Sequence, residues 1–147
     1  MILYADTSAV VKGILLERNT DRVREWFAGA DQVASSIITY PESCAALGRA
    51  HRLRGAAPDA LRRLVAELDA QWSEYLVLPV TARAAGQAAL KHGLRGMDAV
   101  QLSAAVALRA AAAEGAPDAE IVVATFDRRL LEAAEREGFS TLGGPLE

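Results

Sequence analysis

Short apolar runs that read as strands alternate with longer helical patterns along the whole chain, and this rhythm restricts the possible folds most strongly. The strand-like runs lie at 2–5, 32–35, 75–80 and 121–125, and a last short one is expected at 139–142. Parallel strands that are buried on both faces are apolar throughout, whereas half-exposed strands alternate with polar residues. The pattern therefore predicts an α/β protein in which helices cover both faces of a parallel sheet.

Helical spacing of apolar residues predicts the segments that connect these strands. Helices are expected at about 7–16, 20–29, 39–55, 58–68, 81–92, 98–114 and 128–137. The segment that begins at Thr39 and reaches Glu42 matches a capping box, in which the two side chains bind backbone N–H groups of the first turn. Residues 99–108 carry no charge, which predicts a central and nearly buried helix.

Length and composition restrict the class of protein. With 147 residues the chain is expected to form a single domain spanning 1–147. The net charge of −3 gives no sign of tight nonspecific binding to nucleic acid, although bound cations would reverse the local charge at a site. No apolar run is long enough to span a bilayer and no leader peptide opens the chain, which predicts a cytoplasmic protein without a membrane partner. The single cysteine, Cys44, excludes an intramolecular disulfide and a cysteine metal site.

Four carboxylates stand where a strand-like run ends or a helix begins. Asp6 and Asp127 directly follow strands, and Glu42 and Asp98 open helices. Ligands of open α/β sheets bind outside the carboxyl ends of the strands, where these acids are expected to gather. Several carboxylates in one place cannot all stay ionised without a counter-charge, and a hard divalent cation is the simplest one. The four acids are therefore candidate metal ligands and catalytic residues of a site for phosphate chemistry.

Each of these acids also has an ordinary structural interpretation. Asp6, Asp98 and Asp127 are good helix N-caps, and Glu42 could serve only as the capping-box partner of Thr39. The four together are harder to explain in this way. Asp98 in particular opens the most apolar helix of the chain, where a charge without a partner is costly.

Polar neighbours of the acids fit the same chemistry. The hydroxyl groups of Thr7, Ser8 and Thr125 could orient a carboxylate or a bound water, although helix capping explains Ser8 equally well. Four basic residues could contact an RNA backbone and could equally be solvated surface charges: Lys12, Arg49, Arg128 and Arg129. These seven residues are therefore candidates for positioning the acids or the substrate.

Other reaction classes find less support. His51 and His92 lack zinc-ligand spacing and are expected at the surface, and there is no nucleophile elbow, Walker loop or dinucleotide-binding glycine motif. A phosphatase of the haloacid dehalogenase type would need a second aspartate two residues after Asp6, where Ser8 stands. A receiver domain would need an aspartate after the middle strand, and residues 78–80 offer none. A binding module that keeps the fold without the chemistry stays open, although four intact acids argue against it.

Four short motifs, in order along the chain, resemble those of PIN-domain ribonucleases. They are Tyr4-Ala5-Asp6-Thr7-Ser8-Ala9-Val10-Val11-Lys12, Thr39-Tyr40-Pro41-Glu42 with Ala46-Leu47, Leu94-Arg95-Gly96-Met97-Asp98-Ala99-Val100-Gln101-Leu102, and Ala124-Thr125-Phe126-Asp127-Arg128-Arg129-Leu130 with Gly138-Phe139. One D-T-S triplet is weak evidence, whereas four motifs over one small domain are specific. The compact length is also similar to VapC-type toxins of toxin–antitoxin pairs.

This resemblance implies a PIN-like fold, in which about five parallel strands are flanked by helices and one acidic pocket contains Asp6, Glu42, Asp98 and Asp127. It also implies Mg²⁺ or Mn²⁺ as cofactor, RNA as substrate, a homodimer, and a cognate antitoxin that covers the pocket. A housekeeping RNA-processing nuclease of the same family is the alternative to a toxin.

The resemblance also bears on the reaction. No histidine is placed to act as a base, so the expected reaction is metal-assisted attack of water on an RNA phosphodiester, which yields a 5′-phosphate product. The chain departs from some family members because Arg128 and Arg129 replace a further acid near the fourth motif. This departure leaves open whether one or two metal ions bind.

Overall fold

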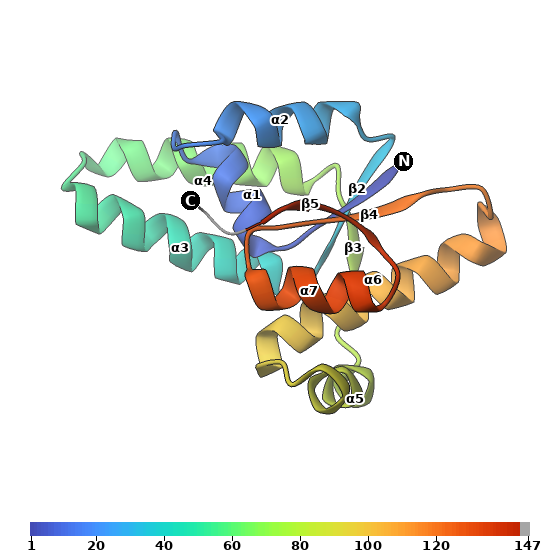
Figure 1. The fold of residues 1–147 in the computed structure, drawn as a ribbon. Helices are drawn as coiled ribbons and strands as arrows, with labels where there is room; N and C mark the ends of the chain where they lie inside the picture. The colour runs from blue at the N-terminus through green and yellow to red at the C-terminus, as the bar shows by residue number, and fades with distance from the viewer. Residues whose placement is uncertain (145–147) are drawn as a thin grey trace.

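The computed structural model describes residues 1–144 and contains a five-stranded sheet (Figure 1). The strands are β1 Ile2–Ala5, β2 Gln32–Ser36, β3 Leu76–Leu78, β4 Ile121–Thr125 and β5 Ser140–Gly143. They lie in the order β3-β2-β1-β4-β5, and every neighbouring pair is parallel. The central strand is therefore β1, and its carboxyl end lies between those of β2 and β4.

Helices cover both faces of this sheet, which confirms the α/β class that the strand pattern predicts. On one face lie α1 (Thr7–Ile14), α2 (Thr20–Gly29), α3 (Thr39–Arg54) and α4 (Pro58–Trp72), and on the other α5 (Ala82–His92), α6 (Gly96–Gly115) and α7 (Arg128–Arg136) (Figure 1). Within residues 1–144, none of the helices has the length and apolar character that crossing a membrane requires.

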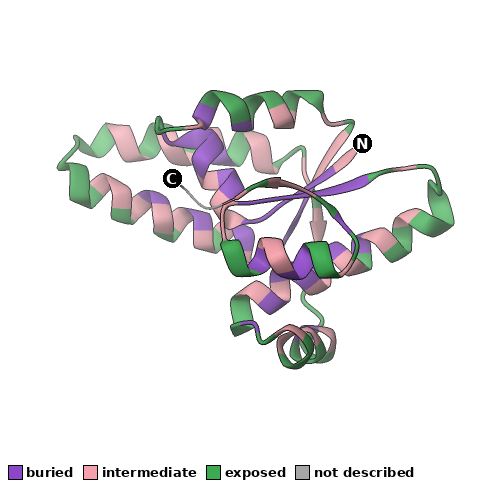
Figure 2. Cartoon of the chain, in the orientation of Figure 1, coloured by how far each residue is buried: buried purple, intermediate pink, exposed green. Residues whose placement is uncertain are grey.

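Two hydrophobic clusters fill the spaces between the sheet and its helices. In β1, Tyr4 belongs to the cluster that packs against α6 and α7, whereas Leu3 and Ala5 belong to the cluster that packs against α1 and α3. Successive side chains of a strand point to opposite faces, so one short strand supplies both clusters. Figure 2 shows the result: β1, β4 and α1 are mostly buried, and the outer faces of the helices are exposed.

The start of α3 differs from the predicted capping box. The N-cap position is Ile38, and no side chain makes a capping hydrogen bond there. The Thr39 hydroxyl instead accepts a hydrogen bond from Gln101, with Nε2 and Oγ1 separated by 3.0 Å. Thr39 is fully buried and also bonds Ser35 Oγ at 2.8 Å, so buried side chains of β2 and α6 take the place of the expected helix cap.

Other element ends are also corrected by the structure. Helix α6 begins at Gly96, so Asp98 lies inside the first turn and is not the N-cap. Helix α1 ends at Ile14, two residues earlier than predicted, because Leu15 has an extended backbone. Strand β3 is shorter than the predicted 75–80 and stops before Pro79, which has no N–H group to donate to a neighbouring strand.

One of the two histidines lies elsewhere than predicted. The side chain of His92 is only 4% exposed, and its Nε2 lies 2.7 Å from Glu137 Oε1. His92 ends α5, and Glu137 directly follows α7. Helix packing therefore buries a histidine that the sequence pattern places at the surface.

The carboxyl edge of the sheet brings distant parts of the chain together. Ala5 of β1 pairs with Ala124 of β4, so the chain leaves these neighbouring strands side by side at Asp6 and at Thr125. The first turns of α3 and α6 reach the same edge, since Glu42 and Asp98 line one pocket with Asp6. This is the position that parallel sheets commonly use for ligand binding.

Candidate active site

Asp6 is the most enclosed of the four acids, with 5% of its surface exposed. As the N-cap of α1, it accepts hydrogen bonds at Oδ1 from Ala9 N (3.0 Å) and from Ser8 Oγ (2.7 Å). Its Oδ2 accepts a third one from Thr125 Oγ1 at 2.8 Å. Burial raises the pKa of Asp6 to about 6, and the three hydrogen bonds oppose this shift by stabilising the ionised form. Asp6 is therefore a helix cap and a pocket residue at the same time.

The two hydroxyls that contact Asp6 are themselves oriented by the segment after β4. Ser8 Oγ accepts a hydrogen bond from Phe126 N at 2.8 Å, and Thr125 Oγ1 accepts one from Asp127 N at 3.0 Å. Each hydroxyl thus receives a backbone donor and directs its own proton at the Asp6 carboxylate. This arrangement couples the first turn of α1 to the start of α7.

Asp127 is the N-cap of α7. Its Oδ1 accepts a hydrogen bond from Leu130 N at 2.9 Å. Its Oδ2 lies 3.9 Å from Arg95 Nη2, which is too far for a hydrogen bond. One carboxylate oxygen of Asp127 is therefore committed to the helix, and the other takes part only in a long ion pair.

Asp98 has a buried carboxylate oxygen that receives no hydrogen bond from the part of the chain that the structure describes. Among residues 1–144, its Oδ2 and Ser43 Oγ are the buried side-chain atoms without a hydrogen-bond partner. Arg95 Nε lies 3.4 Å from Asp98 Oδ2 but lacks hydrogen-bond geometry. Burial raises the pKa of Asp98, the nearby Asp127 raises it further, and Arg95 opposes the shift. A buried carboxylate oxygen without a donor is costly, so this atom marks a place where a cation would be stabilising.

Glu42 reaches the site from α3 and contacts a buried amide. Its Oε1 accepts a hydrogen bond from Thr7 Oγ1 at 2.8 Å and lies 3.4 Å from Gln101 Nε2. Gln101 is 3% exposed, and its own Oε1 accepts a hydrogen bond from Tyr4 OH at 2.7 Å. Because Tyr4 occupies the carbonyl oxygen, the amide must present its NH₂ group to Thr7 and Glu42. The amide therefore orients one oxygen of Glu42.

All four acids line one pocket of about 420 Å³. Its walls come from α1, α3, α6 and the segment that follows β4. The hydroxyls of Thr7 and Ser8 also line the pocket, and Thr125 lies fully buried behind Asp6. The structure thus brings together the acids and the three hydroxyl residues that the sequence singles out.

The predicted RNA-contacting residues divide into two groups. Lys12 and Arg49 line the pocket. Arg128 and Arg129 do not: both are exposed on α7, and Arg128 Nε donates to Glu132 Oε1 at 2.8 Å. Adjacency to Asp127 in the sequence does not bring them into the pocket, because successive residues of a helix point in different directions, and their contact with an RNA backbone outside it stays a prediction. Lys12 and Arg49 are thus the two predicted basic residues that can reach a ligand in this pocket.

The oxygen donors suit a hard divalent cation that keeps part of its water shell. Within the part of the chain that the structure describes, no three acidic, histidine or cysteine side chains converge closely enough to enclose an ion. Mg²⁺ is commonly held by one or two carboxylates and several waters, so it does not need such a group. The unpartnered Oδ2 of Asp98 and the second oxygen of Asp127 fit direct contact. Asp6 already uses three of its roughly four acceptor positions, so it fits contact through one remaining lone pair or through water.

Three side chains of the site were not identified from the sequence. Gln101 is the single amide in the charge-free segment 99–108, and that contrast was the available signal. Arg95 stands three residues before Asp98, a spacing at which helical side chains meet. Glu17, which also lines the pocket, lies in an irregular segment between α1 and α2, where no periodicity points to it.

Comparisons with known proteins find relatives over most of the chain. A family model described as "PIN domain" matches residues 3–136 of the chain. The protein "Ribonuclease VapC45" from Mycobacterium tuberculosis (strain CDC 1551 / Oshkosh) is 33% identical over 140 residues, which cover 93% of this chain and 92% of the relative.

Solved structures share the fold at lower sequence identity. PAE2754 from Pyrobaculum aerophilum is similar with a TM-score of 0.62 and 22% identity, over 96% of this chain and 83% of that one. A chain of a toxin–antitoxin complex from Klebsiella pneumoniae is similar with a TM-score of 0.59 and 17% identity, over 86% of this chain and 87% of that one. These two similarities concern the architecture of the sheet and its helices.

Proposed function

This chain belongs to the PIN domain family, and from that premise we propose that it is a metal-dependent endoribonuclease and the toxin of a toxin–antitoxin pair. The observation that carries the proposal is the convergence of the four acids on one pocket, where Asp98 Oδ2 is buried without a donor. The relative named as a ribonuclease, which matches nearly the whole chain, supports the same activity.

In this proposal the chain's own residues bind and orient. Asp98 and Asp127 would hold a Mg²⁺ or Mn²⁺ ion, Asp6 would complete the acidic wall, and Thr7 and Gln101 hold Glu42 toward the same space. When bound, the ion supplies a water nucleophile at neutral pH and offsets negative charge on the phosphate. Attack by water forms a new bond to phosphorus and breaks the bond from phosphorus to the 3′-oxygen, which takes up a proton and leaves as a 3′-hydroxyl, so the other fragment carries a 5′-phosphate.

The direct test is cleavage of end-labelled total RNA by the purified chain in Mn²⁺. We expect cleavage that EDTA abolishes and that Asp98→Asn lowers by about 100-fold or more, as loss of a residue that stabilises developing charge does elsewhere. Asp59→Asn is the matched control, because Asp59 also lies in a first helical turn and pairs with an arginine three residues away at 3.4 Å, on the exposed α4. Asp59→Asn should cleave like the wild type.

Two results of this assay would contradict the proposal. Cleavage that persists in EDTA and in Asp98→Asn would show that the acids do not carry the reaction. Fragments that end in a 2′,3′-cyclic phosphate would show that the ribose hydroxyl, and not water, attacks the phosphorus.

The toxin role also requires a protein partner that neutralises the toxin. We propose a cognate antitoxin, supported by the similarity to a chain of a toxin–antitoxin complex, and a homodimer, which stays a prediction from the family resemblance. Expression of the wild type should arrest growth, expression of Asp98→Asn should not, and co-expression of the neighbouring small gene should relieve the arrest. Growth unaffected by the active wild type would favour a housekeeping nuclease.

A further inference from the structure

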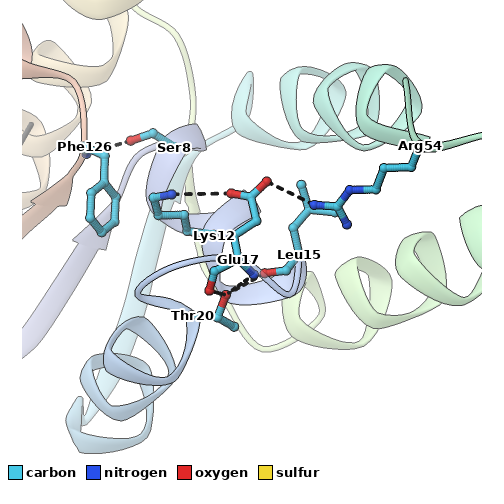
Figure 3. A network of polar contacts seen from close by, with 7 residues as sticks. All are labelled: Ser8, Lys12, Leu15, Glu17, Thr20, Arg54 and Phe126. Atoms are coloured by element: carbon cyan, nitrogen blue, oxygen red, sulfur yellow. Dashed lines mark hydrogen bonds and ion pairs between the residues drawn. The ribbon is translucent and has the colours of Figure 1, made fainter. Parts of the chain in front are cut away.

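Glu17 lies between two cations at the edge of the acidic pocket. Its Oε2 is 3.4 Å from Lys12 Nζ, and its Oε1 is 3.4 Å from Arg54 Nη2. Figure 3 shows Lys12 reaching the carboxylate from α1 and Arg54 reaching it from the last residue of α3. Charge-assisted hydrogen bonds are typically about 2.7–2.9 Å long, so neither cation is held tightly. Lys12 and Arg54 are therefore paired with Glu17, but their hydrogen-bonding capacity is not fully used.

Lys12 differs from an ordinary surface lysine. Its side chain is 8% exposed and lines the pocket, and Nζ lies 5.1 Å from the centroid of the Phe126 ring. An ammonium group has three N–H donors and is costly to bury without acceptors. The aromatic ring and one long contact with Glu17 satisfy this group only in part. A nearly buried cation on the pocket wall thus keeps donor capacity for an anionic ligand.

The position of Glu17 is set by its backbone. Thr20 Oγ1 accepts a hydrogen bond from Glu17 N at 2.9 Å and contacts Leu15 O at 2.6 Å, which shapes the turn between α1 and α2 (Figure 3). Thr20 is 4% exposed, so this anchor is protected from water. The Arg54 side chain is half-exposed at the end of its helix and pairs with Glu17 at 3.4 Å. The backbone of Glu17 is therefore held in place, whereas its side chain, 36% exposed, can move aside for another anion while staying near the two cations.

Building on the proposed ribonuclease function, we infer that Lys12 and Arg54 form a subsite for an RNA backbone phosphate next to the cleaved one, which Glu17 occupies in the free protein. A phosphodiester carries the same charge as a carboxylate and also presents two anionic oxygens, so it can replace Glu17 between the cations. Glu17 then remains beside the phosphate as a like charge. It is thus a built-in competitor that weakens RNA binding.

The test measures binding without cleavage. Fluorescence anisotropy of a labelled, mixed-sequence, single-stranded RNA is followed in EDTA with the full chain, at salt concentrations between about 50 and 200 mM. Glu17→Gln should tighten binding by about threefold or more, because it removes a competing charge. Arg54→Gln and Lys12→Met should weaken binding and lower the slope of log K against log salt by roughly 0.7 for each phosphate that the variant no longer neutralises.

Matched controls separate the subsite from a general change of net charge. Glu67 is a similarly exposed glutamate that pairs with Arg24 at the same 3.4 Å, outside the pocket, so Glu67→Gln removes an equal charge elsewhere. The exposed Arg62 on α4 provides the corresponding control, Arg62→Gln, for Arg54→Gln. Lys12→Met replaces a buried residue, so its folding is checked by thermal melting. Arg54→Gln, at an exposed position, tests the subsite even where Lys12→Met fails to fold.

Each outcome decides the inference independently of the proposed activity. Equal effects of Glu17→Gln and Glu67→Gln, an unchanged salt slope in Arg54→Gln, or no RNA binding by any variant would overturn the subsite. If Mn²⁺-dependent cleavage is intact in that case, the ribonuclease stands and the subsite alone fails. If cleavage is absent but Glu17→Gln still tightens binding relative to Glu67→Gln, the anion subsite stands and the proposed catalytic function fails.

Discussion

Two aspartates of the pocket differ in how the protein compensates their charge. Asp6 receives three hydrogen bonds, from Ala9 N, Ser8 Oγ and Thr125 Oγ1. Asp98 Oδ2 receives none, although burial raises the pKa of both carboxyl groups. A buried carboxylate oxygen without a hydrogen-bond donor lowers stability, and such local conflicts are expected where function requires them. Asp98 is therefore the position where stability and function should oppose each other most.

Replacement of Asp98 should stabilise the metal-free protein. Asp98→Asn keeps the shape of the side chain and removes a charge that Asp127 and Glu42 repel. We expect the melting temperature in EDTA to rise by about 2–4 °C for each kcal/mol recovered, measured by scanning calorimetry. Added Mn²⁺ should reduce the difference in melting temperature between Asp98→Asn and the wild type, because the ion binds and stabilises the wild type. A lower melting temperature of Asp98→Asn in EDTA would mean that Arg95 already compensates the charge.

The end of strand β5 packs against Thr125, a residue that positions Asp6 in the pocket. Gly143 pairs with Thr125, has a φ of +118°, and would place an added Cβ 1.9 Å from the Thr125 carbonyl oxygen. Gly144 N donates a hydrogen bond to the same oxygen at 3.1 Å. Thr125 is the residue that donates to Asp6. The close approach of β5 to β4 at this point therefore needs a glycine and affects the position of an acid in the pocket.

Two neighbouring glycines allow this close approach to be tested. Gly143→Ala should destabilise the protein by about 1–3 kcal/mol through overpacking, in addition to the cost of its positive φ, and should lower cleavage by moving Thr125. Gly144 has a similar φ of +121° but nothing within 4 Å of an added Cβ, so Gly144→Ala carries the backbone cost alone. Urea denaturation compares the two variants. Equal destabilisation by both would show that the close approach to Thr125 does not matter.

Beside the face of the sheet that α5, α6 and α7 cover, one carboxylate joins these three helices. Glu137 Oε1 lies 2.7 Å from Lys91 Nζ and 2.7 Å from His92 Nε2, both at the end of α5, and Glu137 Oε2 lies 3.8 Å from Arg109 Nη2 of α6. Glu137 itself follows α7. These contacts connect α5 and the end of α7 to α6, and α6 is the helix that carries Asp98. They contribute to the stability of the whole domain and not to one element.

Glu137 gives the stability of the protein a specific pH dependence. The hydrogen bond from Lys91, and then that from His92, holds the pKa of Glu137 below its usual value of 4.5. A depressed folded-state pKa adds stability that is present above the unfolded-state pKa and is lost as the pH falls through the folded-state value. Glu137→Gln should therefore be less stable than the wild type at neutral pH, by about 1 kcal/mol, and the difference should shrink in acid.

Thermal melting of the wild type and of Glu137→Gln between about pH 3 and pH 7 tests this pH dependence. The range follows from the lowered pKa of Glu137. Glu132→Gln is the control, since Glu132 pairs with Arg128 on the exposed side of α7. Its difference from the wild type should be small at every pH. A Glu137→Gln deficit that grows as the pH falls would contradict the assigned role of this carboxylate.

The sequence by itself determined the properties that depend on local order. Strand and helix positions, the α/β class, and the capping positions of Asp6 and Asp127 follow from periodicity and from which residue stands at the end of a run. The same reasoning placed the four acids at one edge of the sheet, because parallel strands end there together. Their roles as metal ligands stay a prediction that the cleavage assay tests.

Only the tertiary structure decided which side chains face one another. The Thr39 hydroxyl bonds Ser35 and also Gln101, 62 residues away, and not the expected capping partner Glu42. Likewise the pocket includes Glu17 but excludes Arg128, although Arg128 is adjacent to an acid of the site. The physical reason is that a hydrogen bond between distant residues depends on how helices pack on the sheet. Packing combines all the elements at once, whereas periodicity describes each element alone.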